Sequence, residues 1–220
     1  MIERIQDASP TQLIEVGFSG AYQAQEPYHA KWRVVQRRLE SIRGDGVPHD
    51  AGDNDVYFDL VLRQMEDEHA QHIRSSGQAH PHSRTRIQIQ LTRYWIVSAG
   101  EMLRATRNAT NEGSELWHNL TRLVDRFGAV RMMVAKQQVQ KHKGPHPDTI
   151  GSAVLVEAQD GSGQISCERV DLQRSYRVAP IINRENGSIG FPVYDASGGL
   201  LWDDDRRGLS DLLLSEFGDR

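Results

Sequence analysis

Four histidines within fourteen residues are the side chains of this chain whose types and spacing best fit metal binding. His69 and His72 are three positions apart, so a helix would present both on one face, with Glu66 one turn earlier. His80 or His82 could then fold back as a further ligand of a zinc or nickel ion. The sequence therefore offers Glu66, His69, His72 and His82 as candidate metal ligands.

A solvated helix end and loop are the simpler interpretation of these histidines, and the sequence favours it because such short motifs are unspecific. A di-iron bundle site is disfavoured, because the matching turns of the next two helices carry Arg104 and Arg131. Cys167 is the only cysteine, which excludes an internal disulfide and a zinc site built from thiolates. The acidic run Asp203–Asp205 fits a helix N-cap better than a cation site. We therefore expect no cofactor.

Arg74 and His80 are the candidate catalytic pair, although the sequence favours a protein that is not an enzyme. In a metal-free ribonuclease, a histidine acts as acid or base and an arginine stabilises the charge that develops on the phosphate. The spacing alone is weak support, because an arginine and a histidine this far apart often occur by chance. If the chain is an enzyme, the pattern favours a ribonuclease or a metal-dependent hydrolase.

A basic stretch is the clearest charge feature of the chain. Residues 84 to 143 hold eleven Lys or Arg against four Asp or Glu, which leaves fifteen against twenty-six elsewhere. Apart from Arg131, its basic residues are candidate contacts to phosphates or to an acidic partner. These contacts are Arg84, Arg86, Arg93, Arg104, Arg107, Arg122, Arg126, Lys136, Lys141 and Lys143.

Two interpretations of this basic face carry equal weight. It could bind nucleic acid, with Tyr94, Trp95 and Trp117 available for stacking. It could equally be neutralised within the protein by the preceding helix. The acidic residues of that helix are Asp53, Asp55, Asp59, Glu66, Asp67 and Glu68. Arg131 lies beside an apolar seam, so we expect it to pair with a carboxylate from this acidic helix or from the sheet.

Length and composition indicate a water-soluble globular protein of 220 residues with a net charge of −4. No apolar run approaches the roughly 20 residues that a membrane span needs. The first residues are acidic and lack the apolar stretch of a secretory signal, so we expect a cytoplasmic location and no membrane partner.

Helical periodicity dominates the first two thirds of the chain. Ser9 and Pro10 mark a helix start, and helices are expected over 28–43, 53–76, 84–108 and from 114 onward. The 84–108 segment has apolar residues on two sides, with Ile87 and Tyr94 on one, so we expect both sides to be packed. The next helix has a 4-3 apolar spacing, at Leu120, Leu123, Phe127, Val130 and Val134, which predicts that the two helices lie antiparallel.

After residue 147 the pattern changes to short strands with turn signals at Asp160–Gly163 and Asn186–Gly187, followed by a helix over 209–217. The sequence thus predicts an α+β, helix-dominated fold: a helical bundle over 1–147, then an antiparallel β-meander over 148–220 with a covering C-terminal helix. The favoured function is a non-catalytic binding or scaffold protein that uses the bundle surface and a sheet edge to hold a protein partner or a second copy. The alternative is a nucleic-acid-binding protein or ribonuclease that uses the basic helices.

Overall fold

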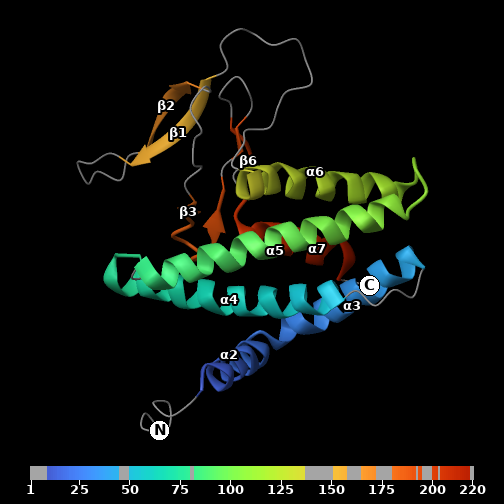
Figure 1. Cartoon of the computed structure of the whole chain (residues 1–220), viewed down its shortest axis with the longest axis horizontal. Coiled ribbons are helices and arrows are strands. Elements are labelled where there is room, and N and C mark those ends of the chain that lie inside the picture. Colours follow the sequence, from blue (N-terminus) through green and yellow to red (C-terminus); the bar gives the residue numbers. More distant parts are fainter. Residues whose placement is uncertain are drawn as a thin grey trace.

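The structure is a computed structural model in which helices dominate (Figure 1). It describes residues 9–44, 50–79, 82–136, 151–157, 165–171, 180–191, 193–194, 200–202 and 204–218. The helices are α2 (Pro10–Ala24), α3 (Glu26–Arg43), α4 (Asp50–Ser76), α5 (His82–Asn108), α6 (Glu115–Lys136) and α7 (Arg206–Phe217). The strands are β1 (Gly151–Glu157), β2 (Ile165–Asp171), β3 (Ile181–Ile182), β4 (Ile189–Gly190), β5 (Val193–Tyr194) and β6 (Leu200–Trp202).

The helix boundaries follow from local capping chemistry, and the expected helices are confirmed. Ser9 begins α2 with a capping box, in which its side chain accepts from the backbone of Gln12 and Gln12 reaches back. Gly44 ends α3 in the left-handed conformation, at φ 69°. Asp205 caps α7 by accepting a hydrogen bond of 2.8 Å from the Gly208 N–H, which bears out the N-cap interpretation of the acidic run.

Helices α5 and α6 form an antiparallel pair, as the apolar seam predicts. Ser114 starts α6 by accepting a hydrogen bond of 3.1 Å from the Trp117 N–H. At Gly100 of α5, a Cβ would lie 3.6 Å from the Cβ of Phe127, an ordinary packing distance, so the two helices are in direct contact there. The ring of Phe127 also lies 5.7 Å from that of Trp95, so this seam forms the centre of the apolar core.

The C-terminal helix belongs to the same core as the N-terminal helices. Leu209, Leu213 and Phe217 of α7 are buried, and α7 packs on α3, α6 and β4. Figure 1 shows α7 behind α5, within the helical layers. The sequence suggested that this helix covers a sheet face, whereas most of its contacts are with helices, because its apolar stripe meets the apolar faces of α3 and α6.

The strands form three separate two-stranded antiparallel pairs, β1 with β2, β3 with β4 and β5 with β6. The predicted antiparallel hairpins are therefore confirmed, but the predicted continuous meander is confirmed only in part. β3 and β4 pair over two residues each, and Gly190 of β4 also forms an isolated antiparallel bridge to Asp205. Among the described residues no helix is long and apolar enough to cross a membrane.

The turn between β3 and β4 is pressed against α4. Gly187 has a φ of 72°, and a side chain there would collide with the carbonyl oxygen of Glu66 and lie 2.7 Å from the backbone nitrogen of Ala70. Only glycine both adopts this positive φ readily and leaves room for the backbone of α4. The Asn186–Gly187 turn therefore fixes the β3–β4 hairpin on the middle of α4, where the charged side chains of that helix are buried.

Candidate functional site

The densest group of charged side chains lies inside the protein. Asp59, Arg63 and Glu66 follow one another at helical spacing on α4, and none of the three is exposed to solvent. A buried charge without a partner costs several kcal/mol, so each of these groups needs an opposite charge nearby. The first two supply this for each other, because Arg63 Nε donates to Asp59 Oδ2 at 2.8 Å.

Helix α7 supplies the remaining cations. Arg206 is fully buried and bridges the two acidic residues of α4, donating to Asp59 and to both oxygens of Glu66. Arg207 Nε donates to Glu66 Oε2 at 2.9 Å. Arg63 reaches back across the same contact to the Ser210 hydroxyl, at 2.7 Å. The arginines therefore clamp α7 onto α4 through charge-assisted hydrogen bonds.

Neighbouring polar groups complete this buried network. The Ser188 hydroxyl, from β3–β4, donates to Glu66 Oε1 at 2.8 Å. The indole of Trp32 donates to Asp59 Oδ2 at 2.7 Å. Asp59 thus has donors from α3, α4 and α7, and Glu66 has donors from α7 and the β3–β4 hairpin, so neither carboxylate is available to a ligand in this arrangement.

The electrostatics of the network favour a structural role. Burial raises the pKa of Asp59, but Arg206 and Arg63 together outweigh this and hold it below its ordinary value. Burial lowers the pKa of Arg206, and Glu66 and Asp59 more than compensate, so it stays above its ordinary value. A catalytic acid or base needs a pKa near the working pH, which neither of these groups has.

Asp55 is the exception among the buried acids of α4. Its side chain is fully buried, and within the described residues no donor meets hydrogen-bond geometry at either carboxylate oxygen. Burial raises its pKa to about 7, Ser98 partly opposes this, and Asp59 adds to it. Asp55 is thus a carboxylic acid that changes charge near neutral pH, yet it has no surface at which a substrate could meet it.

The candidate metal ligands do not converge in the described residues. Glu66 is held by the arginines, and His69 is buried with its Nδ1 2.9 Å from Gln88 Oε1. Gln88 in turn donates to the Gly187 carbonyl oxygen at 2.8 Å. Within the described part of the chain, no three His, Cys, Asp or Glu side chains are grouped to hold a metal ion. The side chain of His82 lies outside it.

Two further Glu-x-x-His motifs, at Glu26 to His29 and at Glu115 to His118, escaped the sequence reasoning. They lie on α3 and α6 and join no metal-binding group among the residues that the structure describes. The catalytic pair is placed only in part. Arg74 is exposed and points a nitrogen at the Glu185 carbonyl oxygen, 3.4 Å away, while His80 falls outside the described residues.

The basic face of α5 and α6 is largely matched by carboxylates of the protein itself. The ion pairs are Arg84 with Glu68, Arg104 and Arg131 with Glu101, Arg122 with Glu216, and Arg126 with Asp204. Neutralisation by the acidic helix α4 is thus found at Glu68, whereas Asp59 and Glu66 of that helix engage α7 instead. Asp59 and Glu66 point toward α7 because they lie on the buried side of α4.

Arg131 and the basic residues outside these ion pairs differ in their surroundings. Arg131 takes its carboxylate from Glu101 on α5, not from the acidic helix or the sheet, because α5 is its antiparallel neighbour. The guanidinium of Arg93 lies 5.9 Å from the centre of the Phe191 ring. Arg86 and Arg107 have no carboxylate within ion-pair distance in the described part of the chain. Lys141 and Lys143 lie outside that part, as does the Lys136 side chain.

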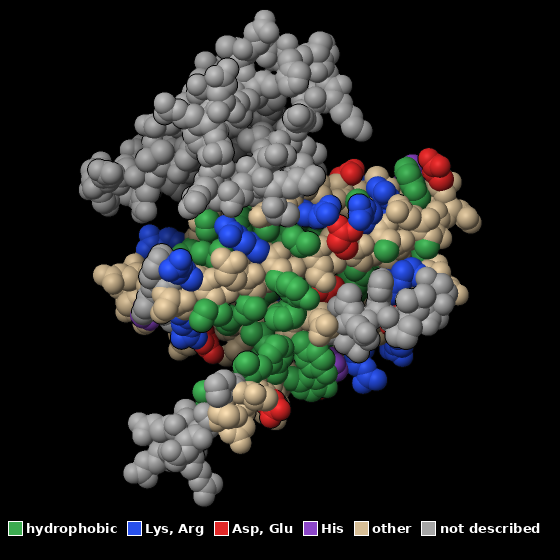
Figure 2. Space-filling model, viewed as in Figure 1, with side chains coloured by type: hydrophobic (Ala, Val, Ile, Leu, Met, Phe, Trp, Pro, Cys, Tyr) green, Lys and Arg blue, Asp and Glu red, His purple; other side chains and the backbone are tan. Residues whose placement is uncertain are grey.

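An exposed apolar surface spans α2, α4 and α5, and we call it the α2–α4–α5 surface. A row of aromatic contacts joins the helices: Phe18 lies 6.2 Å from Tyr57 and 6.1 Å from Phe58, and Phe58 lies 4.9 Å from Tyr94, ring centre to ring centre. Figure 2 shows hydrophobic side chains gathered over the middle of this face. Its residues are Leu13, Ile14, Val16, Phe18, Tyr57, Phe58, Ile87 and Tyr94.

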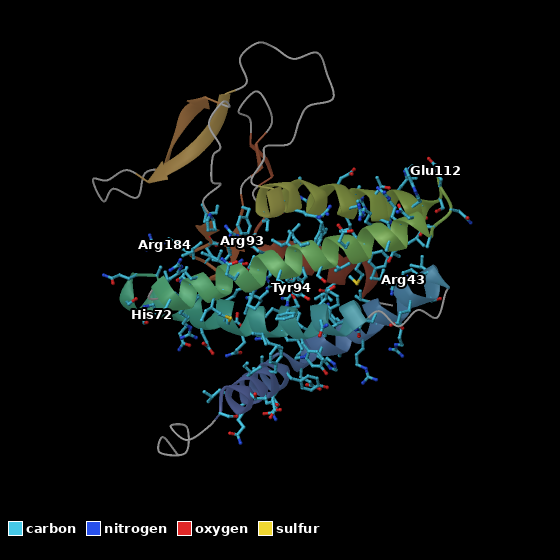
Figure 3. All side chains as sticks on the ribbon, in the orientation of Figure 1. Arg43, His72, Arg93, Tyr94, Glu112 and Arg184 are labelled. Atoms are coloured by element: carbon cyan, nitrogen blue, oxygen red, sulfur yellow. The ribbon has the colours of Figure 1, made fainter. Side chains whose placement is uncertain are left out.

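Several of these side chains are half exposed or more. Val16 is 70% exposed, Ile14 58% and Tyr94 51%. Figure 3 shows Tyr94 between α5 and α4, near the middle of the face. The sequence placed Ile87 and Tyr94 on a packed side of α5. The structure corrects this, because the core is formed by the other side, with Ile96 and Leu103, and nothing in the described residues covers Ile87 and Tyr94 fully.

Comparison of the chain with known protein families, with curated proteins and with solved structures finds no match.

Proposed function

We propose that this chain is a non-catalytic binding protein whose α2–α4–α5 surface docks onto another polypeptide. The observation that carries the proposal is the exposure of adjoining aromatic and aliphatic side chains from three helices, with Tyr94 near their middle. Monomeric proteins seldom leave such side chains together in water, and those that do commonly use them for association. Tyrosine suits this role, because it offers a large contact area and a polar tip with little flexibility.

The chemistry of the interior agrees with a role outside catalysis. In the buried network, the carboxylates of Asp59 and Glu66 are paired with Arg63 and Arg206, and these charges hold α7 against α4. Such a network favours one arrangement of the helices over others, because any shift would strand a buried charge. A rigid bundle is a suitable support for a docking surface.

Nucleic-acid binding through the basic helices is the second candidate, and the ion pairs of the basic stretch weigh against it. Five of its arginines contact carboxylates of the same chain, so a phosphate would have to compete for them. Phosphate binding depends on releasing counterions from the nucleic acid, and an arginine that is already paired contributes less to that release. Arg86 is the exposed arginine best placed to retain such a role.

Size-exclusion chromatography of host lysates at native expression level tests the proposal. We expect the protein to elute as a species larger than its 24.9 kDa monomer, and Tyr94→Glu to return it to the monomer position. Tyr94 is 51% exposed, so this change alters the surface and not the core. Glu112→Lys, at the exposed turn between α5 and α6, is the matched control and should leave the elution unchanged (Figure 3). A wild-type protein that elutes as a monomer would contradict the proposal.

A further inference from the structure

Helix α2 has two apolar faces, and only one of them is covered. Phe18, Ala21 and Gln25 face α4: Phe18 meets Tyr57 edge-on, Ala21 is buried, and Gln25 Nε2 donates to Asp67 Oδ2 at 2.9 Å. The adjacent face, one residue earlier in register, is exposed along its whole length. It consists of Leu13, Gly17, Gly20 and Ala24, flanked by Val16.

This exposed face, which we call the α2 seam, has the spacing of a helix-packing interface. Its residues are separated by four, three and four positions, as in the seam between two packed helices. Gly17 and Gly20 leave an open groove at its centre, because no atom of the described residues lies within 4 Å of where their Cβ atoms would be. Glycines so placed allow a second helix backbone to approach closely.

The order of large and small residues along the seam selects the partner. Leu13 lies at one end, Ala24 at the other, and the two glycines lie between them. An antiparallel copy of the same helix would place Leu13 opposite Ala24 at both ends and Gly17 opposite Gly20 between them, so the two helix axes can stay evenly spaced along the contact. A parallel copy would place leucine against leucine at one end and alanine against alanine at the other, which leaves a void at the small end.

On this basis we infer that a second copy of this chain occupies the α2–α4–α5 surface, an inference that rests on the proposed function. The two copies would form a two-fold dimer whose centre is an antiparallel contact between the two α2 seams. Two-fold pairing of one surface with itself is the commonest form of protein association. It requires a surface that does not repel itself. Glu15 is the only charged residue between Pro10 and Ala24, and helical geometry places it on the side of α2 opposite the seam.

The exposed apolar area is sufficient for such a dimer. Among the described residues, six large apolar side chains of this surface are at least 36% exposed. At about 90 Å² each, roughly half of a fully exposed side chain, they offer about 540 Å² per protomer. A two-fold pair would then bury about 1,100 Å², which is close to the lower end of specific protein interfaces.

Sedimentation equilibrium of the purified full-length protein, at concentrations from about 1 to 200 µM, is the first test. We expect a dimer, and Gly20→Leu should raise its dissociation constant at least ten-fold by filling the groove. Leucine fits the protomer at this position. Nonspecific hydrophobic association would instead be strengthened by an added leucine. An unchanged or tighter dimer in Gly20→Leu would overturn the inference, as would a monomer at every concentration.

Disulfide trapping in a Cys167→Ser background tests the antiparallel orientation. A mixture of Leu13→Cys and Ala24→Cys proteins should form a linked dimer quickly, while each alone should link slowly, because disulfides need the two Cα atoms within about 7 Å. Rapid linking of Leu13→Cys to itself would mean a parallel contact and would contradict the inference. If the purified protein is a monomer but still forms a Tyr94-dependent complex in lysate, the dimer inference is wrong and the proposed function stands. If the protein is a monomer both when purified and in lysate, the inference and the proposed function are both wrong.

Discussion

Replacement of Asp55 by asparagine should stabilise the protein above neutral pH. This buried carboxyl has a pKa raised to about 7 from an ordinary 3.8, first because it is buried and further because Asp59 is near. Between these two pH values the folded protein keeps a proton that the unfolded chain releases, so folding stability falls as the pH rises through this window. Above about pH 7 both states are ionised and the loss is complete.

The magnitude follows from the shift. A difference of about three pKa units corresponds to about 4 kcal/mol, and about 3 kcal/mol of this is lost between pH 5 and pH 8. Asparagine has nearly the same shape and no charge. We therefore expect the free energy of unfolding of Asp55→Asn to exceed that of the wild type by an amount that grows by about 3 kcal/mol over this range.

Urea or guanidinium denaturation of both proteins at pH 5, 6, 7 and 8 measures this difference. The comparison between variant and wild type cancels the titration of all groups that they share. Asp125→Asn, at an exposed position of α6, controls for the loss of a carboxylate as such. A difference between Asp55→Asn and wild type that stays constant with pH would refute the reasoning, because it would mean that Asp55 titrates alike in the folded and unfolded states.

Three further predictions concern the interior and the basic face. Arg206→Ala should lower the free energy of unfolding by about 3–5 kcal/mol in urea denaturation, because it removes the buried cation that bridges Asp59 and Glu66; Arg104→Ala, which removes an exposed ion pair, should cost at most about 1 kcal/mol. Gly187→Ala should cost about 2–3 kcal/mol or more through its collision with the Glu66 carbonyl, whereas Gly208→Ala, where a Cβ meets only an ordinary contact at 3.6 Å, should not. Labelled single-stranded RNA should show little anisotropy change at about 150 mM salt, and tight, strongly salt-dependent binding would instead favour the basic helices as a phosphate site.

The helices could be predicted from the sequence because their signals are local. Each signal lies within a few residues of the feature that it predicts: the caps at Ser9 and Ser114, the helix end at Gly44, and the 4-3 apolar spacing. The Asn186–Gly187 turn has the same local character. Antiparallel packing of α5 and α6 followed from their seam and the short turn between them.

The buried charge network could not be predicted, because its two halves are about 140 positions apart in the chain. The acidic residues of α4 were assigned to the nearer basic helices, which is the reasonable assumption when only sequence distance is known. One signal was available: Asp59, Arg63 and Glu66 share a face with the apolar residues of α4, so burial with a remote partner could have been suspected. The pair Arg206–Arg207 at the start of a short amphipathic helix was the matching signal.

The exposed apolar surface was missed for a related reason. Apolar periodicity reports that a helix face avoids water, and it does not report whether the covering element belongs to the same chain. Ile87 and Tyr94 were therefore assigned to the core, and of α2 only the start at Ser9 and Pro10 was recognised. A binding surface and a core surface look alike in sequence, and only the packing distinguishes them.

Photo-crosslinking from position 94 in living cells tests the docking surface most directly. A benzophenone amino acid in place of Tyr94 should yield a specific crosslinked species of defined mass, either twice that of the chain or that of a complex with another protein. The same group in place of Glu112, at the exposed turn away from the α2–α4–α5 surface, should yield little (Figure 3). Equal crosslinking from both positions, or none from position 94, would contradict the account.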